Sequence, residues 1–381
     1  MTDRPYFSAV IPYYDRLPYI ERVLHALSDQ DAYLDDLEIV IACLEYSESL
    51  LRLLADLPPL IRTRVIMTRE LWNVSTARNL AMRHAEGQVL LLLDADMVLP
   101  SSFLRRLRDE YDPLERQAVV VGQMLNYSAY TEVSADNLHD YAYYKDRYLA
   151  GNCRAGLGID ARWNCARKIP WSLCWTALVA IPRFLVEERS LYFDQSFAGW
   201  GAEDLEWGYR IQCAGIPIHF ADDLWGIHLP HLRDVRKNCA DQEQNYDRFL
   251  SKWPCFEVEI VTRFGDAFAN HRFDEFVAAL DDVRGPGQTV NVVDFSVGAF
   301  RHLAVGAVSD SDGTLLNCGD VPGMSAANIN KRIPLLGLRL PYASRSMDSA
   351  YLLGSIRKAP SSIQELIYSE VDRVAASAIW L

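Results

Sequence analysis

The sequence lacks the features that mark nucleic-acid-binding, membrane-spanning and disulfide-stabilised proteins. Lysine and arginine number 38 against 51 aspartate and glutamate residues, so the formal net charge is 38 − 51 = −13 and no polyanion-binding surface is expected. No apolar run approaches the roughly 20 residues of a membrane-spanning helix. The eight cysteines include no C-x-x-C pair, which argues against a zinc ribbon and a disulfide framework. We therefore expect a cytoplasmic protein with no integral membrane segment and no nucleic-acid partner.

What the sequence contains is typical of a folded α/β protein. Half of its residues are apolar and 23% are charged, which excludes disorder, collagen and coiled coil. At roughly 100 to 200 residues per domain, 381 residues predict two domains. We place the first domain at residues 1–260 and a smaller C-terminal α/β domain of unknown role at residues 261–381.

Apolar runs alternate with helical patterns near the start of the chain. Between the apolar runs 64–67 and 89–93, Ser75 is the expected N-cap of a helix that extends to His84. This alternation predicts a doubly wound, mostly parallel sheet, in which ligands bind at the carboxyl ends of the strands. The expected strands are residues 7–11, 37–42, 64–67 and 89–93.

Two carboxylates, Asp94 and Asp96, directly follow the all-apolar strand 89–93. At the carboxyl end of a central strand they cannot both face the core. Their like charges are compatible with a divalent cation or with its phosphates. A bare D-x-D pair is usually a solvated acidic loop, but its position after this strand favours a binding site.

Three further features could join this acidic pair. Arg78 lies in the first turns of the helix before it and could hold a phosphate, orient a carboxylate or simply lie on the surface. Glu203 and Asp204 follow a glycine-rich turn and fall in the first turn of an expected helix. There they could have only a structural role, as acidic residues at a helix N-terminus, or one of them could supply a general base. His228 and His231 could be structural or could complete a metal site, and nitrogen ligands would favour manganese over magnesium.

Together these features resemble the nucleotide-sugar-dependent glycosyltransferases of the GT-A fold, specifically family 2. The acceptor-side motif is similar to that of the galactosyltransferase and chondroitin-polymerase type. The resemblance covers roughly residues 6 to 235, and the order of its segments is more specific than any one of them. The segments are Ser8-Ala-Val-Ile-Pro-Tyr-Tyr14, Asn73 to Asn79, Leu93-Asp-Ala-Asp96, Gly199-Trp-Gly-Ala-Glu-Asp204 and His228.

The resemblance implies a GT-A-type doubly wound sheet and metal-dependent transfer of a sugar from a nucleotide sugar, with UDP preferred. Mn²⁺, or Mg²⁺, would be held by Asp96 and His228, with His231 as the alternative ligand. The family usually ends its second strand with an acidic pair, whereas this chain has Cys43-Leu44-Glu45, so the nucleotide stays open. Nucleotide-sugar binding is implied for Pro12, Tyr13, Glu45, Arg78, Asp94, Ala95 and Trp200.

On the acceptor side, the resemblance implies inversion in a single displacement. Asp204 would take the proton of the acceptor hydroxyl, while Glu203 and Trp200 would shape the acceptor side. The acceptor could be a glycan, a peptide or a small natural product. Two alternatives remain: a nucleotide-sugar- or glycan-binding module without turnover, and a sugar-nucleotide nucleotidyltransferase, whose usual glycine-rich loop is missing after the first strand.

Overall fold

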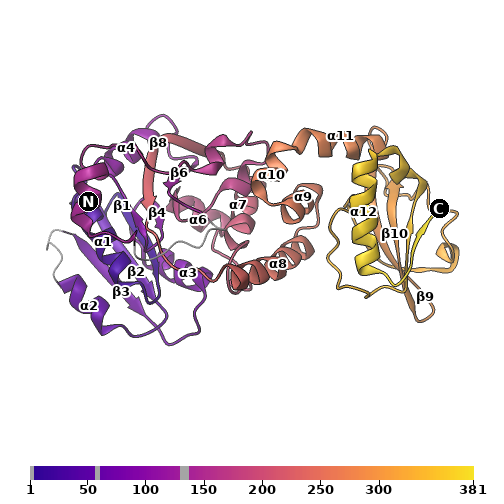
Figure 1. Cartoon of the computed structure of the whole chain (residues 1–381), viewed down its shortest axis with the longest axis horizontal. Helices are drawn as coiled ribbons and strands as arrows, with labels where there is room; N and C mark the ends of the chain where they lie inside the picture. Colours follow the sequence, from indigo (N-terminus) through magenta and orange to yellow (C-terminus); the bar gives the residue numbers. More distant parts are fainter. Residues whose placement is uncertain (1–3, 56–60, 129–136) are drawn as a thin grey trace. The chain divides into compact units, whose positions relative to one another are not determined.

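The computed structural model describes residues 4–55, 61–128 and 137–381, and the chain divides into two compact units. Unit 1 comprises Met1–Asn164 and Pro170–Gln242, and unit 2 comprises Cys165–Ile169 and Glu243–Leu381 (Figure 1). The expected domain boundary after residue 260 falls inside helix α9 (Phe256–Phe264), which lies wholly within unit 2.

Unit 1 is built on one eight-stranded sheet. The first four strands in its order are mutually parallel, and β6 and β8 run in the same direction, whereas β7 and the short edge strand β5 run against them. The expected doubly wound, mostly parallel sheet is therefore confirmed. The strand order is β3 (Arg62–Met67), β2 (Leu37–Cys43), β1 (Phe7–Tyr13), β4 (Val89–Leu93), β7 (Leu178–Pro182), β6 (Val119–Leu125), β8 (Ile218–His228) and β5 (Met97–Val98).

Helices cover both faces of this sheet (Figure 1). One apolar cluster joins alternate residues of β1, β2 and β4 to α1 (Leu17–Ser28), α2 (Glu48–Ala55) and α4 (Phe103–Tyr111). A second cluster joins the intervening residues to α3 (Val74–His84), α6 (Arg183–Arg189) and α7 (Glu203–Cys213). Because both faces are covered, every residue of β4 is buried and can be apolar.

The start of α3 differs from the expectation. Its N-cap is Asn73, whose Oδ1 accepts a hydrogen bond from the Thr76 backbone N–H at 2.9 Å, whereas the expected cap, Ser75, is a buried residue inside the helix. The Asn73 amide also donates to the carbonyl of Phe197 at 2.8 Å. The cap therefore ties the start of α3 to the segment that leads into α7.

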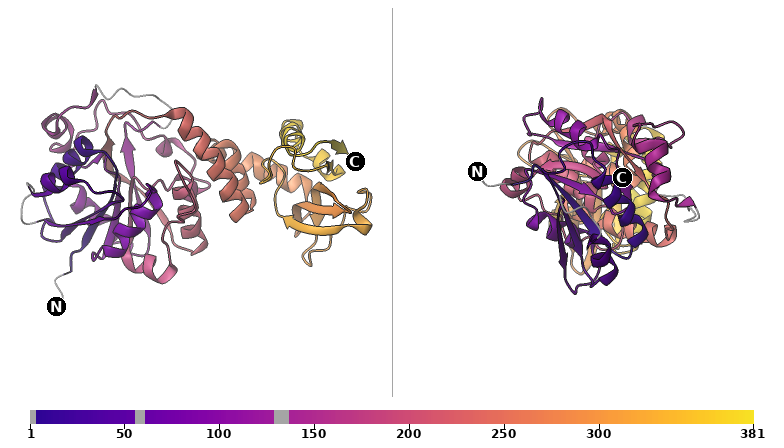
Figure 2. Two further views of the ribbon diagram at one scale, coloured as in Figure 1. Left: turned by 90° about the horizontal axis from the view of Figure 1, so that it is seen from below. Right: turned by 90° about the vertical axis from the view of Figure 1, so that its left-hand side faces the viewer.

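Unit 2 contains a separate five-stranded sheet. Helix α12 (Ser361–Val374) links its parallel strands β12 and β13 and lies against the sheet (Figures 1 and 2). In the described parts of the chain, no helix has both the length and the apolar character needed to cross a bilayer. The strand order is β11 (Asn328–Ile333), β9 (Thr289–Val297), β10 (Phe300–Ser309), β12 (Ser349–Leu352) and β13 (Ala378–Trp380). Among the described residues, the other α-helices are α5 (Tyr141–Tyr144) in unit 1, α8 (Val235–Lys252), which begins in unit 1 and ends in unit 2, and α10 (Asp266–His271) and α11 (Phe273–Val283) in unit 2.

A buried carboxylate organises a loop within unit 2. Glu259 of α9 is fully buried, and its two oxygens accept hydrogen bonds from the backbone N–H groups of Leu336, Gly337 and Leu338 at 2.8, 2.7 and 2.6 Å. These backbone N–H groups belong to buried residues, so losing the carboxylate would leave several of them without a hydrogen-bond acceptor.

We predict that Glu259→Gln lowers the free energy of unfolding by about 2–4 kcal/mol, because the amide keeps one good acceptor and turns a donor toward backbone donors. The midpoint of urea denaturation of the full chain measures this. Glu365→Gln, on the exposed side of α12, removes the same charge and should leave the midpoint unchanged. Equal midpoints for both variants would contradict the assigned role of Glu259.

Candidate active site

The candidate site residues gather at one edge of the unit 1 sheet. Strands β1, β2, β4, β6 and β8 all end there, and the short strand β5 begins there. The antiparallel pairing of β5 with β8 sets Met97 opposite His228, and the Leu229 backbone N–H donates to the Asp96 carbonyl at 2.9 Å. Backbone pairing therefore brings the end of the acidic motif beside a histidine 132 positions later in the chain.

Asp96, His228 and His231 form a buried cluster of three potential metal ligands. Asp96 Oδ2 lies 3.2 Å from His231 Nε2, and Asp96 Oδ1 lies 3.7 Å from His228 Nε2. The three residues are only 5–8% exposed. Among the described residues, Asp96 Oδ1 has no hydrogen-bond partner, although it is buried. A buried, unpartnered carboxylate oxygen facing two imidazoles is what a cation site offers.

The charge states in this cluster suit a cation. Burial lowers the pKa of His228 to about 4, so its imidazole is neutral near pH 7 and keeps a lone pair for a ligand. Burial opposes ionisation of Asp96, but His228, His231 and the Arg16 guanidinium together hold its pKa below the usual value. The cluster thus offers one carboxylate and, from His228, one neutral nitrogen donor.

Two arginines that sequence reasoning missed also reach this cluster. The Arg16 guanidinium pairs with Asp96 Oδ2, and Arg233 Nη2 lies 3.0 Å from His228 Nε2 and 3.5 Å from His231 Nε2. The only available signal was proximity in sequence, because Arg233 follows the second histidine by two residues and Arg16 follows the first strand by three. Such proximity does not distinguish them from surface arginines.

The second group in the site centres on Arg78. This buried guanidinium bonds Asp94 Oδ1 at 3.1 Å and Glu203 Oε1 at 3.1 Å. Burial opposes the charge, but the carboxylates of Asp94 and Glu203 outweigh it and raise the pKa of Arg78 above its usual value. Of the roles left open by the sequence, the structure supports orientation of carboxylates. Asp204, next to Glu203 at the start of α7, is only half-buried.

The turn before α7 needs its glycines. Gly199 and Gly201 have φ of +75° and +89°, and Ala202 also adopts a left-handed conformation. A Cβ atom on Gly199 would lie 2.3 Å from Asp241 Oδ2, which accepts a hydrogen bond from the Trp200 backbone N–H at 3.3 Å. The close approach of Asp241 therefore fixes the turn that presents Glu203 and Asp204.

On the expected nucleotide side, Tyr13 is 2% exposed and packs into the core, and Pro12 is also buried. The next residue, Tyr14, is exposed and stacks on Trp72, with ring centroids 5.0 Å apart and an interplanar angle of 22°. Sequence reasoning missed this aromatic pair. Of the other expected residues, Ala95 is buried, and Glu45 and Trp200 are half-buried.

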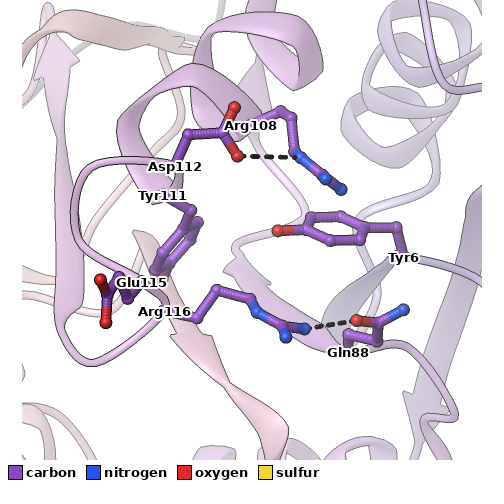
Figure 3. A pocket seen from close by; sticks show the side chains of 7 residues that line it. All are labelled: Tyr6, Gln88, Arg108, Tyr111, Asp112, Glu115 and Arg116. Carbon is purple, nitrogen blue, oxygen red and sulfur yellow. Dashed lines mark hydrogen bonds and ion pairs between the residues drawn. The ribbon is translucent and has the colours of Figure 1, made fainter.

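Two cavities in unit 1 differ in their relation to this edge. One, of about 480 Å³, is lined by His228, His231 and Arg233 together with Tyr127 and Tyr144, and so opens beside the candidate metal ligands. The other, of about 380 Å³, is shown in Figure 3. It lies at the opposite end of the sheet.

The Figure 3 cavity lies at the amino ends of the parallel strands, because its lining residues Tyr6 and Gln88 come just before β1 and β4. Its polar side chains also satisfy each other: Arg108 pairs with Asp112 at 3.3 Å, and Arg116 bonds Gln88 (Figure 3). Ligands of open α/β sheets bind at the carboxyl ends of strands, so this cavity is not the candidate active site.

Comparison with known proteins supports the assignment that the sheet and site suggest. Residues 8–163 match the model of glycosyl transferase family 2. The segment of the chain that matches this glycosyltransferase model lies within unit 1 and includes its first strands, and the doubly wound sheet of unit 1 is of the GT-A type.

Curated relatives extend the similarity over the whole chain. The validoxylamine A glucosyltransferase of Streptomyces hygroscopicus subsp. jinggangensis (strain 5008) is 26% identical, with 98% of this chain and 96% of the relative covered. That of Streptomyces hygroscopicus subsp. limoneus is 23% identical, with 98% and 90% covered. Among solved structures, the Pyrobaculum calidifontis mannosyltransferase PcManGT, in complex with GDP-Man and Mn²⁺, has a TM-score of 0.48 at 19% identity, with 73% and 75% covered. S. aureus TarS 1-349 has a TM-score of 0.47 at 15% identity, with the same coverage.

We predict that Gly199→Ala destabilises the protein more than Gly215→Ala. Gly215 also has positive φ, at +72°, but nothing lies within 4 Å of its added Cβ, so that substitution costs only the left-handed conformation, about 1–2 kcal/mol. At Gly199 the clash with Asp241 adds about 1–3 kcal/mol. Urea denaturation measures both, and the double variant Gly199→Ala/Asp241→Ala should recover part of the loss. The assigned clash is wrong if the two single variants are equally stable.

Proposed function

We propose that the chain transfers a hexosyl group from a UDP-sugar to an acceptor hydroxyl with inversion, and that it needs a divalent cation. The single observation that carries this proposal is the buried cluster of Asp96, His228 and His231, with an unpartnered carboxylate oxygen, at the strand edge that also holds the Arg78 network. A nucleotide-sugar site needs a place for a diphosphate and for a cation, and this edge offers both.

The residues present fit a bound cation. Asp96 and His228 would hold it, with His231 as a third or alternative ligand, and mixed oxygen and nitrogen donors favour Mn²⁺ over Mg²⁺. A cation held there would neutralise the negative charge that develops on the diphosphate as it leaves. The formal charge of −13 makes such local neutralisation necessary, because the surface as a whole repels an anionic donor.

The donor would lie along the same edge. Tyr14, which is exposed, and Glu45 follow the ends of the neighbouring strands β1 and β2 and would face the nucleoside, while the buried Pro12 and Tyr13 would support them from beneath. Arg78 would hold Asp94 in place for the ribose and diphosphate region, with Ala95 and Trp200 completing the donor site. Both full-length relatives carry the name glucosyltransferase, which makes UDP-glucose the first donor to test.

Asp204 is the proposed general base. Glu203 is bonded to Arg78, and Asp204, the next residue of α7, is half-buried, so an incoming acceptor can reach its carboxylate. The acceptor oxygen would form its bond to the anomeric carbon as the bond from that carbon to the diphosphate breaks. The hydroxyl proton would pass to the Asp204 carboxylate. In-line attack from the side opposite the leaving group gives inversion.

The acceptor is proposed to be a small natural product rather than a glycan or a peptide, on the basis of the relatives' names. Validoxylamine A is accordingly the first acceptor to test. Trp171 is fully buried and packs in the core, whereas Tyr127, Tyr143 and Tyr148 line the cavity of about 480 Å³ and so could contact an acceptor. That cavity is large enough for a small polyhydroxylated molecule.

We expect Asp204→Asn to lower the rate of sugar transfer by roughly 10²- to 10⁴-fold while leaving Mn²⁺ affinity unchanged, because it removes the proton acceptor alone. Asp96→Asn should lose both Mn²⁺ binding and transfer, because it removes a ligand. Transfer is measured by nucleotide release, and Mn²⁺ binding by the paramagnetic resonance signal of the free ion. Asp109→Asn, an exposed acid on α4, is the charge-matched control. Full transfer activity of Asp204→Asn would refute the assignment of the base.

A donor screen without acceptor tests the nucleotide and the sugar. The donors to compare are UDP-glucose, UDP-galactose, their N-acetyl forms and GDP-mannose. Without acceptor we expect slow hydrolysis, fastest for UDP-glucose. This hydrolysis should depend on Mn²⁺ and stop when a chelator is added. Nucleotide release is the measurement. Faster release from GDP-mannose than from every UDP-sugar would overturn the nucleotide assignment, and release unaffected by chelation would overturn the cation requirement.

A further inference from the structure

Arg233 occupies an unusual position for an arginine. One nitrogen of its guanidinium lies 3.0 Å from His228 Nε2 and 3.5 Å from His231 Nε2, and another donates to the carbonyl of Ser128. Its central carbon lies 4.8 Å from the centre of the Tyr127 ring. A guanidinium can only donate hydrogen bonds, so His228 Nε2 must accept and must carry the lone pair.

This lone pair is the one that a cation would use. The second potential nitrogen ligand, His231 Nε2, lies 3.2 Å from Asp96 Oδ2 and 3.5 Å from Arg233 Nη2. Arg233 therefore stands where a cation bound to the two histidines would stand, and Arg16 is likewise paired with Asp96. A guanidinium and a divalent cation cannot share His228 Nε2, since this atom has one lone pair and like charges repel strongly at a buried site.

We propose that Arg233 closes the cation site in the free protein and binds the diphosphate of the donor once the cation takes its place. This inference rests on the proposed function, because it assumes a cation at Asp96 and the two histidines. Arg233 has somewhere to move, since it lines the cavity of about 480 Å³ that also borders both histidines. The planar, forked guanidinium suits phosphate oxygens, which it can bind in pairs.

The proposal makes cation and nucleotide binding cooperative. A cation binding alone must displace Arg233 from the histidines and leave its charge without a partner. A diphosphate that arrives with the cation accepts that guanidinium, so each ligand favours the other. Arg233 is thus a donor-binding residue whose effect on cation affinity changes sign with the presence of nucleotide.

The test compares Arg233→Ala with the wild type in two titrations. Mn²⁺ is titrated without nucleotide by paramagnetic resonance, and UDP is titrated in saturating Mn²⁺ by calorimetry. In Arg233→Ala we expect Mn²⁺ alone to bind roughly 5-fold tighter or more, UDP to bind at least about 10-fold more weakly, and the mutual enhancement to shrink accordingly. Arg236→Ala, which removes an exposed arginine of the same segment, should match the wild type in both titrations.

The opposite signs separate this role from a structural one. Weaker Mn²⁺ binding in Arg233→Ala, or unchanged binding of both ligands, would overturn the inference, because an arginine that merely supported the histidines would weaken both. Arg233→Gln, which keeps a donor but loses the charge, should give the same two signs if the alanine variant folds poorly. If wild type and Asp96→Asn bind Mn²⁺ equally, the proposed cation site itself fails, and that result differs from either outcome at Arg233.

Discussion

The site depends on one constraint: a carboxylate buried at the end of a central strand must be compensated by other groups. Asp96 is 5% exposed, and burial alone would favour its neutral form. The β5–β8 pairing supplies His228 beside it, and the segment that follows supplies His231. Arg16 pairs with the carboxylate, and Arg233 contacts His228.

The neighbouring network obeys the same rule with a different outcome. Asp94 and Glu203 both face Arg78, a permanent charge from α3, and each lies within hydrogen-bond distance of it. The Asn73 cap and the close approach of Asp241 to Gly199 hold the two helix starts from which Arg78 and Glu203 extend. The two aspartates of a single D-x-D motif thus lie in different environments. Asp94 bonds the Arg78 guanidinium, whereas Asp96 Oδ1 has no hydrogen-bond partner among the described residues. This division fits a site that orients one acid and keeps the other for a ligand.

Local patterns predicted much of unit 1. The strand 89–93 was predicted at its observed bounds, because five apolar residues in a row fit a strand covered on both faces. The helix through His84 was also predicted, but its cap was wrong: Asn73 and Ser75 are both good caps by composition. The choice between them depends on the Phe197 carbonyl, which lies more than a hundred residues away in sequence. A contact between residues so far apart in sequence cannot be predicted from a local sequence pattern.

The sequence by itself determined the order of strands and helices, the acidic pair after β4, and the chemical types of the candidate ligands, because period and residue type are local properties. The tertiary structure alone decided that Tyr13 packs inward while Tyr14 faces out, and that Arg16 and Arg233 reach the buried acid and the histidines. Direction and partnership depend on the register of strands far apart in sequence, and a register is fixed only when the whole sheet has formed.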